Sequence, residues 1–235
     1  MPSKNSTKIY IKDGIYHIYN RGIEKRDVFL DEQDYKMFLS LLKRYLLSPD
    51  VFAKLCTVRT VRTGPSWQLE SVVNQVRPVR QSELYKQIRL FCFCLMPNHF
   101  HLMIQQLSER VIIEFMKSLT NAYVEYFNEK YDRRNIGPLF QGRYKAVLIN
   151  KEPQFLCLPY YIHFHNPEEL YKNETEKNLI KKVQDYPWSS YGDYLGKRNS
   201  KWIYKKGIME QFIETEKTQP DIETTRETLG QTAID

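Results

Sequence analysis

Apolar side chains recur at three- and four-residue intervals between residues 31 and 47, where the sequence reads DEQDYKMFLSLLKRYLL. Tyr35, Phe38, Leu39, Leu42 and Leu46 fall on this spacing, behind an acidic first turn. A period of 3.6 residues puts such positions on one face, and acidic side chains favour the start of a helix. The pattern therefore predicts an amphipathic helix.

Three segments have the β-branched, aromatic and apolar composition of strands. Residues 10–19 (YIKDGIYHIY) contain an Asp-Gly turn signal and then lead into a strand. Residues 90–96 are apolar throughout, and residues 99–105 follow them after a Pro-Asn turn. This succession predicts one strand near the start of the chain and a β-hairpin in its middle.

The second half of the chain repeats the helical pattern. Residues 111–131 carry an apolar stripe at helical spacing, residues 146–149 form a short strand candidate, and residues 154–164 are favoured as a helix despite Pro159. The predicted order is strand, helix, two strands, helix, strand, helix. That order is typical of a small antiparallel α+β sandwich rather than of a parallel, doubly wound sheet.

Two regions depart from the periodic pattern. Between residues 48 and 89 the periodicity is lost and two similar basic stretches appear, at 58–62 and 76–80, so we interpret this region as a basic insertion. Beyond residue 196 the chain becomes polar, and after residue 214 it turns acidic. We therefore predict one domain over residues 1–195 and a loosely attached polar tail over 196–235.

Composition narrows the class of protein. With 42% hydrophobic and 14% aromatic residues in 235, the chain is a folded globular protein rather than a disordered or collagen-like one. No apolar run approaches the roughly 18 residues of a membrane span, and the first residues are polar, which predicts a cytoplasmic protein. The net charge of +7 favours a polyanionic partner only weakly on its own. The four cysteines form no CxxC pair and are expected to be reduced thiols.

The first candidate for chemistry is the pair His99 and His101. Two residues apart on a strand, they project from the same face, while Phe100 points to the other. Neutral imidazoles suit a divalent cation, but two ligands need a third from elsewhere. Taken alone, the pair is read more simply as two histidines on a sheet face. His17, on the first strand, is expected to have a structural or supporting role.

The second candidate is the segment YYIHFHNP at 160–167. On a helix, Tyr161 and His165 would lie one turn apart on the same face, which couples a phenol to a metal ligand. A phenol attacks phosphorus when the phosphate is polarised, as a divalent cation can do. The alternative is that these aromatic residues are core side chains. By the same geometry, His163 points away from the metal.

Six motifs, taken together and in this order, resemble the IS200-like single-tyrosine transposases, and among them the branch associated with repetitive extragenic palindromes (REP). They are YHIYNRG (16–22), DEQDYKMFLSLL (31–42), CLMPNHFHLMI (94–104), GPLFQGRYKAVLI (137–149), YIHFHNP (161–167) and DYPWSSYGDY (185–194). The resemblance implies a ferredoxin-like antiparallel sheet with helices packed on it, the HUH endonuclease type of domain. It also implies a bacterial cytoplasmic protein that associates with the nucleoid when bound to DNA.

The same resemblance assigns roles at the site. His99 and His101 become ligands of Mg²⁺ or Mn²⁺, and Tyr161 becomes the nucleophile. Family members usually carry an amide residue four positions after the tyrosine as the third ligand. Here that position holds His165, and Asn166 follows it. The third ligand is therefore His165 by helical geometry, or Asn166 if the helix carries a bulge.

The implied activity is cleavage and rejoining of single-stranded DNA through a 5′-phosphotyrosine intermediate, next to a recognised DNA hairpin. Basic and polar residues in the matching motifs are expected to contact DNA: Asn20, Arg21, Arg133, Arg134, Gln141, Arg143 and Lys145. The alternatives are a non-catalytic DNA or RNA hairpin-binding protein derived from such an enzyme, and a phosphodiesterase that uses water. Family members act either as monomers or as homodimers that exchange the tyrosine helix, and both states stay open.

Overall fold

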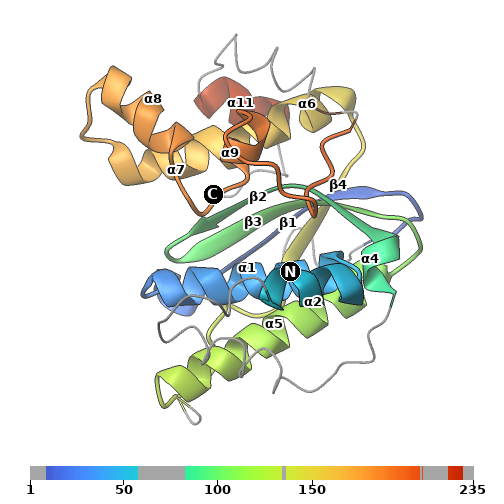
Figure 1. Ribbon diagram of the computed structural model, residues 1–235. Coiled ribbons are helices and arrows are strands. Elements are labelled where there is room, and N and C mark those ends of the chain that lie inside the picture. The colour runs from blue at the N-terminus through green and yellow to red at the C-terminus, as the bar shows by residue number, and fades with distance from the viewer. Residues whose placement is uncertain (1–8, 58–82, 134–135, 207, 209–221, 230–235) are drawn as a thin grey trace, which may run out of the picture.

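The computed structural model describes residues 9–57, 83–133, 136–206, 208 and 222–229. Its centre is a four-stranded antiparallel sheet in the order β2-β3-β1-β4, built from β1 (Ile15–Arg21), β2 (Ile88–Met96), β3 (His99–Gln106) and β4 (Lys145–Ile149). Helices cover both faces of the sheet (Figure 1). The succession β1-α1-β2-β3-α5-β4 in this strand order is the ferredoxin-like topology. The predicted α+β fold is confirmed.

One face of the sheet is covered by α1 (Glu32–Leu46) and α5 (Val111–Lys130). Both are the helices that the apolar spacing predicted. Asp31 caps α1, because its side chain accepts from the backbone N–H groups of Gln33 and Asp34. In return, the Asp34 carboxylate accepts from the backbone N–H of Asp31, which completes a capping box. Phe38 of α1 packs on Phe100 of β3 with 5.1 Å between ring centroids. Phe38 also contacts Tyr123 of α5 with 5.1 Å between ring centroids, so β3 and both helices share one core.

The other face is covered by a chain of short helices: α6 (Glu152–Tyr160), the π-helix η2 (Tyr161–His165), α7 (Asn166–Glu168), the 3₁₀-helix η3 (Glu169–Tyr171), α8 (Glu176–Gln184) and α9 (Tyr191–Tyr194). Buried side chains tie this layer to β2. The Tyr186 hydroxyl donates to the Leu95 carbonyl at 2.7 Å, and the Tyr194 hydroxyl donates to the Phe91 carbonyl at 2.9 Å. These bonds seat the segment that carries Tyr161 on the sheet.

The chain after residue 196 is attached to the domain where it is described, which corrects the prediction of a loose tail. Trp202 stacks on Phe93 at 5.2 Å, and the Tyr204 N–H donates to the Leu90 carbonyl at 2.8 Å along the edge of β2. Helix α11 (Ile222–Leu229) packs on α6, and the Gln154 side chain donates to the Leu229 carbonyl. The polar composition of this segment gives no indication of these few contacts.

Part of the predicted insertion at 48–89 is regular. Helix α2 (Pro49–Thr57) follows α1 directly, and α4 (Leu84–Gln87) leads into β2, which begins before residue 89. Pro49 suits the first position of a helix because its missing N–H is not needed there. The two basic stretches at 58–62 and 76–80 lie outside the described residues. A further short 3₁₀-helix, η1 (Ile23–Lys25), follows β1.

The side chains of three of the four cysteines are described by the structure. Cys92, Cys94 and Cys157 are free thiols, and burial raises the pKa of each. Within the described ranges, no helix has both the length and the apolar character needed to cross a membrane.

Candidate active site

Pairing of β1 with β3 gathers the site on the face covered by the short helices. In the register of this pair, Tyr19 lies opposite His101 and Arg21 lies opposite His99. Side chains at every second position of a strand share a face. His17, Tyr19 and Arg21 therefore project beside the two histidines of β3.

His101 is fully buried and one of its ring nitrogens is already engaged. Its Nδ1 lies 2.9 Å from Nε2 of His17, and the two rings lie edge to edge, 16° from parallel, with centroids 5.1 Å apart. Its Nε2 is also buried and has no hydrogen-bond partner in the part of the chain that the structure describes. Burial, followed by the nearby charges of His99, His17 and Arg21, holds the pKa of His101 well below its usual range. The ring is therefore a neutral imidazole whose Nε2 is available to bind a ligand.

His99 lies between two amide side chains. Its Nδ1 contacts Oδ1 of Asn98, whose amide nitrogen donates to the Lys25 carbonyl at 3.2 Å. The Asn166 side chain is a second hydrogen-bonding neighbour of this ring. Burial, assisted by the charge of Arg21, lowers the pKa of His99 to about 4. A neutral imidazole has a single N–H and cannot donate to two amide oxygens, so a cation at Nε2 would satisfy the second contact.

Tyr161, the predicted nucleophile, lies beside these histidines. Its ring centroid is 5.9 Å from that of His101 and 6.2 Å from that of His17, both in edge-on arrangements. Only 3% of the residue is exposed. It is the first residue of η2, and Pro159 precedes it at the end of α6. Proline cannot donate the regular backbone bond, which suits a helix that changes its winding at this point.

The winding of η2 decides which residue after Tyr161 faces the histidines. The backbone N–H of Asn166 bonds to the carbonyl of Tyr161, five residues earlier, and the Asn166 side chain donates to that carbonyl at 3.0 Å. In a π-turn the i+5 residue occupies the place that i+4 takes in an α-helix. Asn166 therefore takes the place beside His99. With its amide nitrogen engaged, its oxygen is left to face the ring.

His165, predicted from α-helical spacing, has partners elsewhere. Its Nδ1 contacts the Glu168 carboxylate at 2.9 Å, and its Nε2 contacts the Thr225 hydroxyl at 3.2 Å. Among the described residues, no group of three His, Cys, Asp or Glu side chains is arranged to hold a metal. Of the two candidates for a third ligand, the structure places Asn166, and not His165, with His99. The reason is the extra residue in the turn.

His163 points away from the two histidines of β3, as expected. Its Nε2 lies 2.7 Å from the Ser190 hydroxyl, and its ring stacks on Tyr191 at 5.3 Å. Burial, then the charge of Arg198, lowers the pKa of His163 to about 3. This histidine anchors η2 to the segment before α9.

A groove of about 1280 Å³ lies between α5, the end of β1 and the loop before β4, and it shares Tyr19 and Arg21 with this site. Its lining includes five of the seven residues predicted to contact DNA: Asn20, Arg21, Gln141, Arg143 and Lys145. It also includes polar residues of α5 that the motifs did not indicate, Lys117, Asn121 and Asn128, and the tyrosines Tyr10, Tyr19 and Tyr144. The sequence does not indicate these α5 residues as DNA contacts, because charged and amide side chains are common on the exposed face of any helix.

Asn20, Arg133 and Arg134 differ from the other four predicted DNA contacts. Asn20 also borders the groove but is 5% exposed, and its amide donates to the Gly142 carbonyl, so it holds the loop. The Arg133 guanidinium lies over the Phe127 ring, 5.6 Å from its centroid. Arg134 lies outside the described residues.

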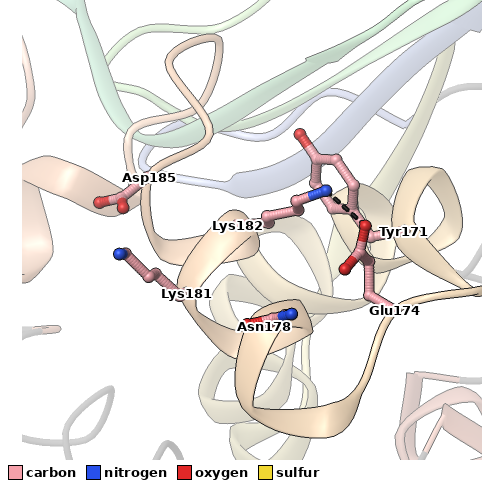
Figure 2. A pocket seen from close by; sticks show the side chains of 6 residues that line it. All are labelled: Tyr171, Glu174, Asn178, Lys181, Lys182 and Asp185. Atoms are coloured by element: carbon pink, nitrogen blue, oxygen red, sulfur yellow. Dashed lines mark hydrogen bonds and ion pairs between the residues drawn. The ribbon is translucent and has the colours of Figure 1, made fainter.

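A second hollow lies beside α8 (Figure 2). Its lining consists of Tyr171, Glu174, Asn178, Lys181, Lys182 and Asp185. Lys182 pairs with Glu174, and Asp185 pairs with Lys197. The lining shares no residue with the site around His99 and Tyr161, and its two carboxylates are satisfied by neighbouring lysines.

Comparison with known proteins was made in three ways. No curated protein matches the chain significantly. The solved structure of a REP-associated tyrosine transposase bound to a REP hairpin is similar at 14% sequence identity and a TM-score of 0.48, covering 88% of this chain and 93% of that one. The family model described as "Transposase IS200 like" matches residues 61–165, which include His99, His101 and Tyr161. Residues 61–165 of this chain are therefore similar to the IS200-like transposases.

Proposed function

We propose that this protein is a metal-dependent transposase that cleaves and rejoins single-stranded DNA with Tyr161 as its nucleophile. One observation carries the proposal. The Tyr161 ring and the Asn166 amide meet Nε2 of His101, which has no partner among the described residues, on one face of the sheet. Residues 61–165, which contain His101 and Tyr161, match the model of a transposase family. Two neutral imidazoles and an amide oxygen form a suitable donor set for a divalent cation.

His99, His101 and Asn166 would hold the cation, Mg²⁺ or Mn²⁺. When bound, it would polarise the scissile phosphate and offset the charge that develops there. The Tyr161 oxygen forms a bond to phosphorus, the bond from phosphorus to the 3′ oxygen breaks, and a 5′-phosphotyrosine results. The phenolic proton passes to solvent, and the released 3′ oxygen takes up a proton. Attack by a 3′ hydroxyl on the phosphotyrosine reverses the step and joins DNA ends.

The neighbouring side chains suit a single strand that runs from the groove to this site. Arg21 lies opposite His99 and also lines the groove. Arg143 and Lys145 extend the positive charge, and the tyrosines of the lining offer faces on which bases can stack. Recognition of a DNA hairpin next to the cleaved strand belongs to the same proposal and rests on the resemblance of the motifs to the family.

Covalent capture of DNA tests this proposal. The protein is incubated with single-stranded oligonucleotides from both flanks of its gene and Mn²⁺, and intact mass and peptide mapping then identify any adduct. We expect an adduct on Tyr161 that requires metal and is lost in Tyr161→Phe. Tyr160→Phe is the matched control, because Tyr160 is the adjacent tyrosine but stacks on Phe164 at 5.1 Å.

Two results would contradict the proposal. An adduct that survives Tyr161→Phe would move the nucleophile to another residue. Tight hairpin binding without any adduct would identify a non-catalytic hairpin-binding protein instead.

A further inference from the structure

The two histidines of β3 each use Nδ1 for a contact inside the protein. Nδ1 of His99 contacts Asn98, and Nδ1 of His101 contacts His17. Neutral histidine holds its one ring proton on either nitrogen, and the partner of one nitrogen decides whether the other has a lone pair. The contacts at Nδ1 therefore control what Nε2 can bind.

At His99 the partner settles the position of the proton. The Asn98 amide nitrogen donates to the Lys25 carbonyl, so its oxygen is the atom that meets Nδ1. An amide oxygen only accepts. His99 must therefore donate from Nδ1, which leaves the lone pair on Nε2.

At His101 the partner is another imidazole, which accepts with one nitrogen as readily as it donates with it. The 2.9 Å separation joins Nε2 of His17 to Nδ1 of His101, and both residues are fully buried. Nε2 of His101 has no hydrogen-bond partner among the described residues. A proton on that atom would be a buried donor without an acceptor, which is unfavourable by about 1–3 kcal/mol. The arrangement instead favours a proton on Nδ1, donated to His17.

We propose that His17 is a positioning residue that accepts the Nδ1 proton of His101 and so presents the Nε2 lone pair of His101 to the metal. This inference rests on the proposed function, because it assigns His17 a part in the same metal site. The two rings lie edge to edge along this hydrogen bond, 16° from parallel, so the bond holds the plane of His101 as well as its tautomer. Partners that orient metal ligands in this way typically affect metal affinity by about 10- to 100-fold.

Two substitutions separate the acceptor from the ring. His17→Phe keeps an aromatic ring against His101 but removes the acceptor. His17→Gln removes the ring but can place an amide oxygen near the position of Nε2. Mn²⁺ alone is the probe, titrated into the metal-free protein and followed by electron paramagnetic resonance. We expect affinity for Mn²⁺ to fall by about 10- to 100-fold in His17→Phe and to return to within about threefold of the wild type in His17→Gln.

A second measurement reads the tautomer without metal. Nitrogen-15 NMR of the imidazole side chains distinguishes protonated from unprotonated ring nitrogens. The expected spectrum has the His101 proton on Nδ1 in the wild type and in His17→Gln, and on Nε2 in His17→Phe. Thermal unfolding of each metal-free variant shows that it is folded.

The outcomes separate this inference from the proposed function. Wild-type binding of Mn²⁺ with unchanged affinity in His17→Phe would refute the role of His17 and leave the metal site intact. Equal losses in both variants would make the role of His17 purely structural. Absence of Mn²⁺ binding in the wild type would overturn the metal site itself, and a His101 proton on Nε2 in the metal-free wild type would overturn the inference independently.

Discussion

His163 makes the stability of this protein depend on pH in a way that can be calculated. Burial lowers its pKa from 6.5 to about 3 in the folded protein, whereas the unfolded chain keeps the ordinary value. Above pH 6.5 both states are neutral at this residue and it has no effect. Between pH 6.5 and 3 the unfolded state binds a proton that the folded state does not. The free energy of unfolding therefore falls as the pH falls.

Each such proton changes the free energy of unfolding by about 1.4 kcal/mol per pH unit. Burial lowers the pKa values of His99 and His101 as well, so both add to the loss of stability of the metal-free protein as the pH falls.

The perturbation is His163→Gln, which removes the titrating group and can keep a hydrogen bond to Ser190. Urea unfolding followed by tryptophan fluorescence at pH 5.5 and 4.5, with a chelator present, gives the two free energies for each protein. We expect the pH dependence of the variant to be shallower by about 1.4 kcal/mol per pH unit, whatever its absolute stability. An identical pH dependence in both proteins would refute the conclusion that His163 stays neutral when folded.

The remaining predictions concern the third ligand, the DNA path and the start of α1. Asn166→Ala should weaken Mn²⁺ binding by at least the 10-fold that supporting residues typically control, whereas His165→Ala should leave it nearly unchanged; calorimetric titration giving the reverse order would restore His165 as the ligand. Arg21→Ala should weaken binding of single-stranded DNA and reduce the dependence of log affinity on log salt by about 0.7, the value for one phosphate contact; an unchanged slope in fluorescence anisotropy would exclude that contact. Asp34→Ala should lower the free energy of unfolding by about 3–5 kcal/mol, because the buried Asp34 carboxylate pairs with Lys130 at 2.7 Å and accepts from the hydroxyls of Tyr126 and Tyr131. Lys130 keeps its second partner, Asp31. A loss below about 1 kcal/mol in chemical denaturation would contradict this.

The fold follows from the sequence where single elements carry strong patterns. The apolar spacing of residues 31–47 and 111–131 predicted α1 and α5, and the Pro-Asn turn predicted the β2–β3 hairpin. Helix α8 and the attachment of Trp202 were missed. Their contacts are few and lie between segments far apart in sequence, which a local pattern does not reveal.

At the site, the sequence predicts which residues take part better than it predicts how their side chains are oriented. His99, His101 and Tyr161 were singled out from spacing and motif, and the structure brings them together. The choice between His165 and Asn166 depended on one turn of helix, since α- and π-windings place different residues at the same point. The neighbours of His17 left its face open, and only the register of β1 against β3 puts it behind His101.

The π-turn at η2 also bears on how such proteins tolerate length changes. One extra residue in an α-helix rotates everything after it by about 100°, which would turn a following docking surface away from the sheet. Here the single π-turn accommodates the extra residue, and Asn166 and Pro167 follow it one turn after Tyr161. A gap-free alignment with a chain whose tyrosine segment is a regular α-helix would place His165, and not Asn166, at the position that faces the sheet. Such a chain is better aligned to this one with a one-residue gap between Tyr161 and Asn166.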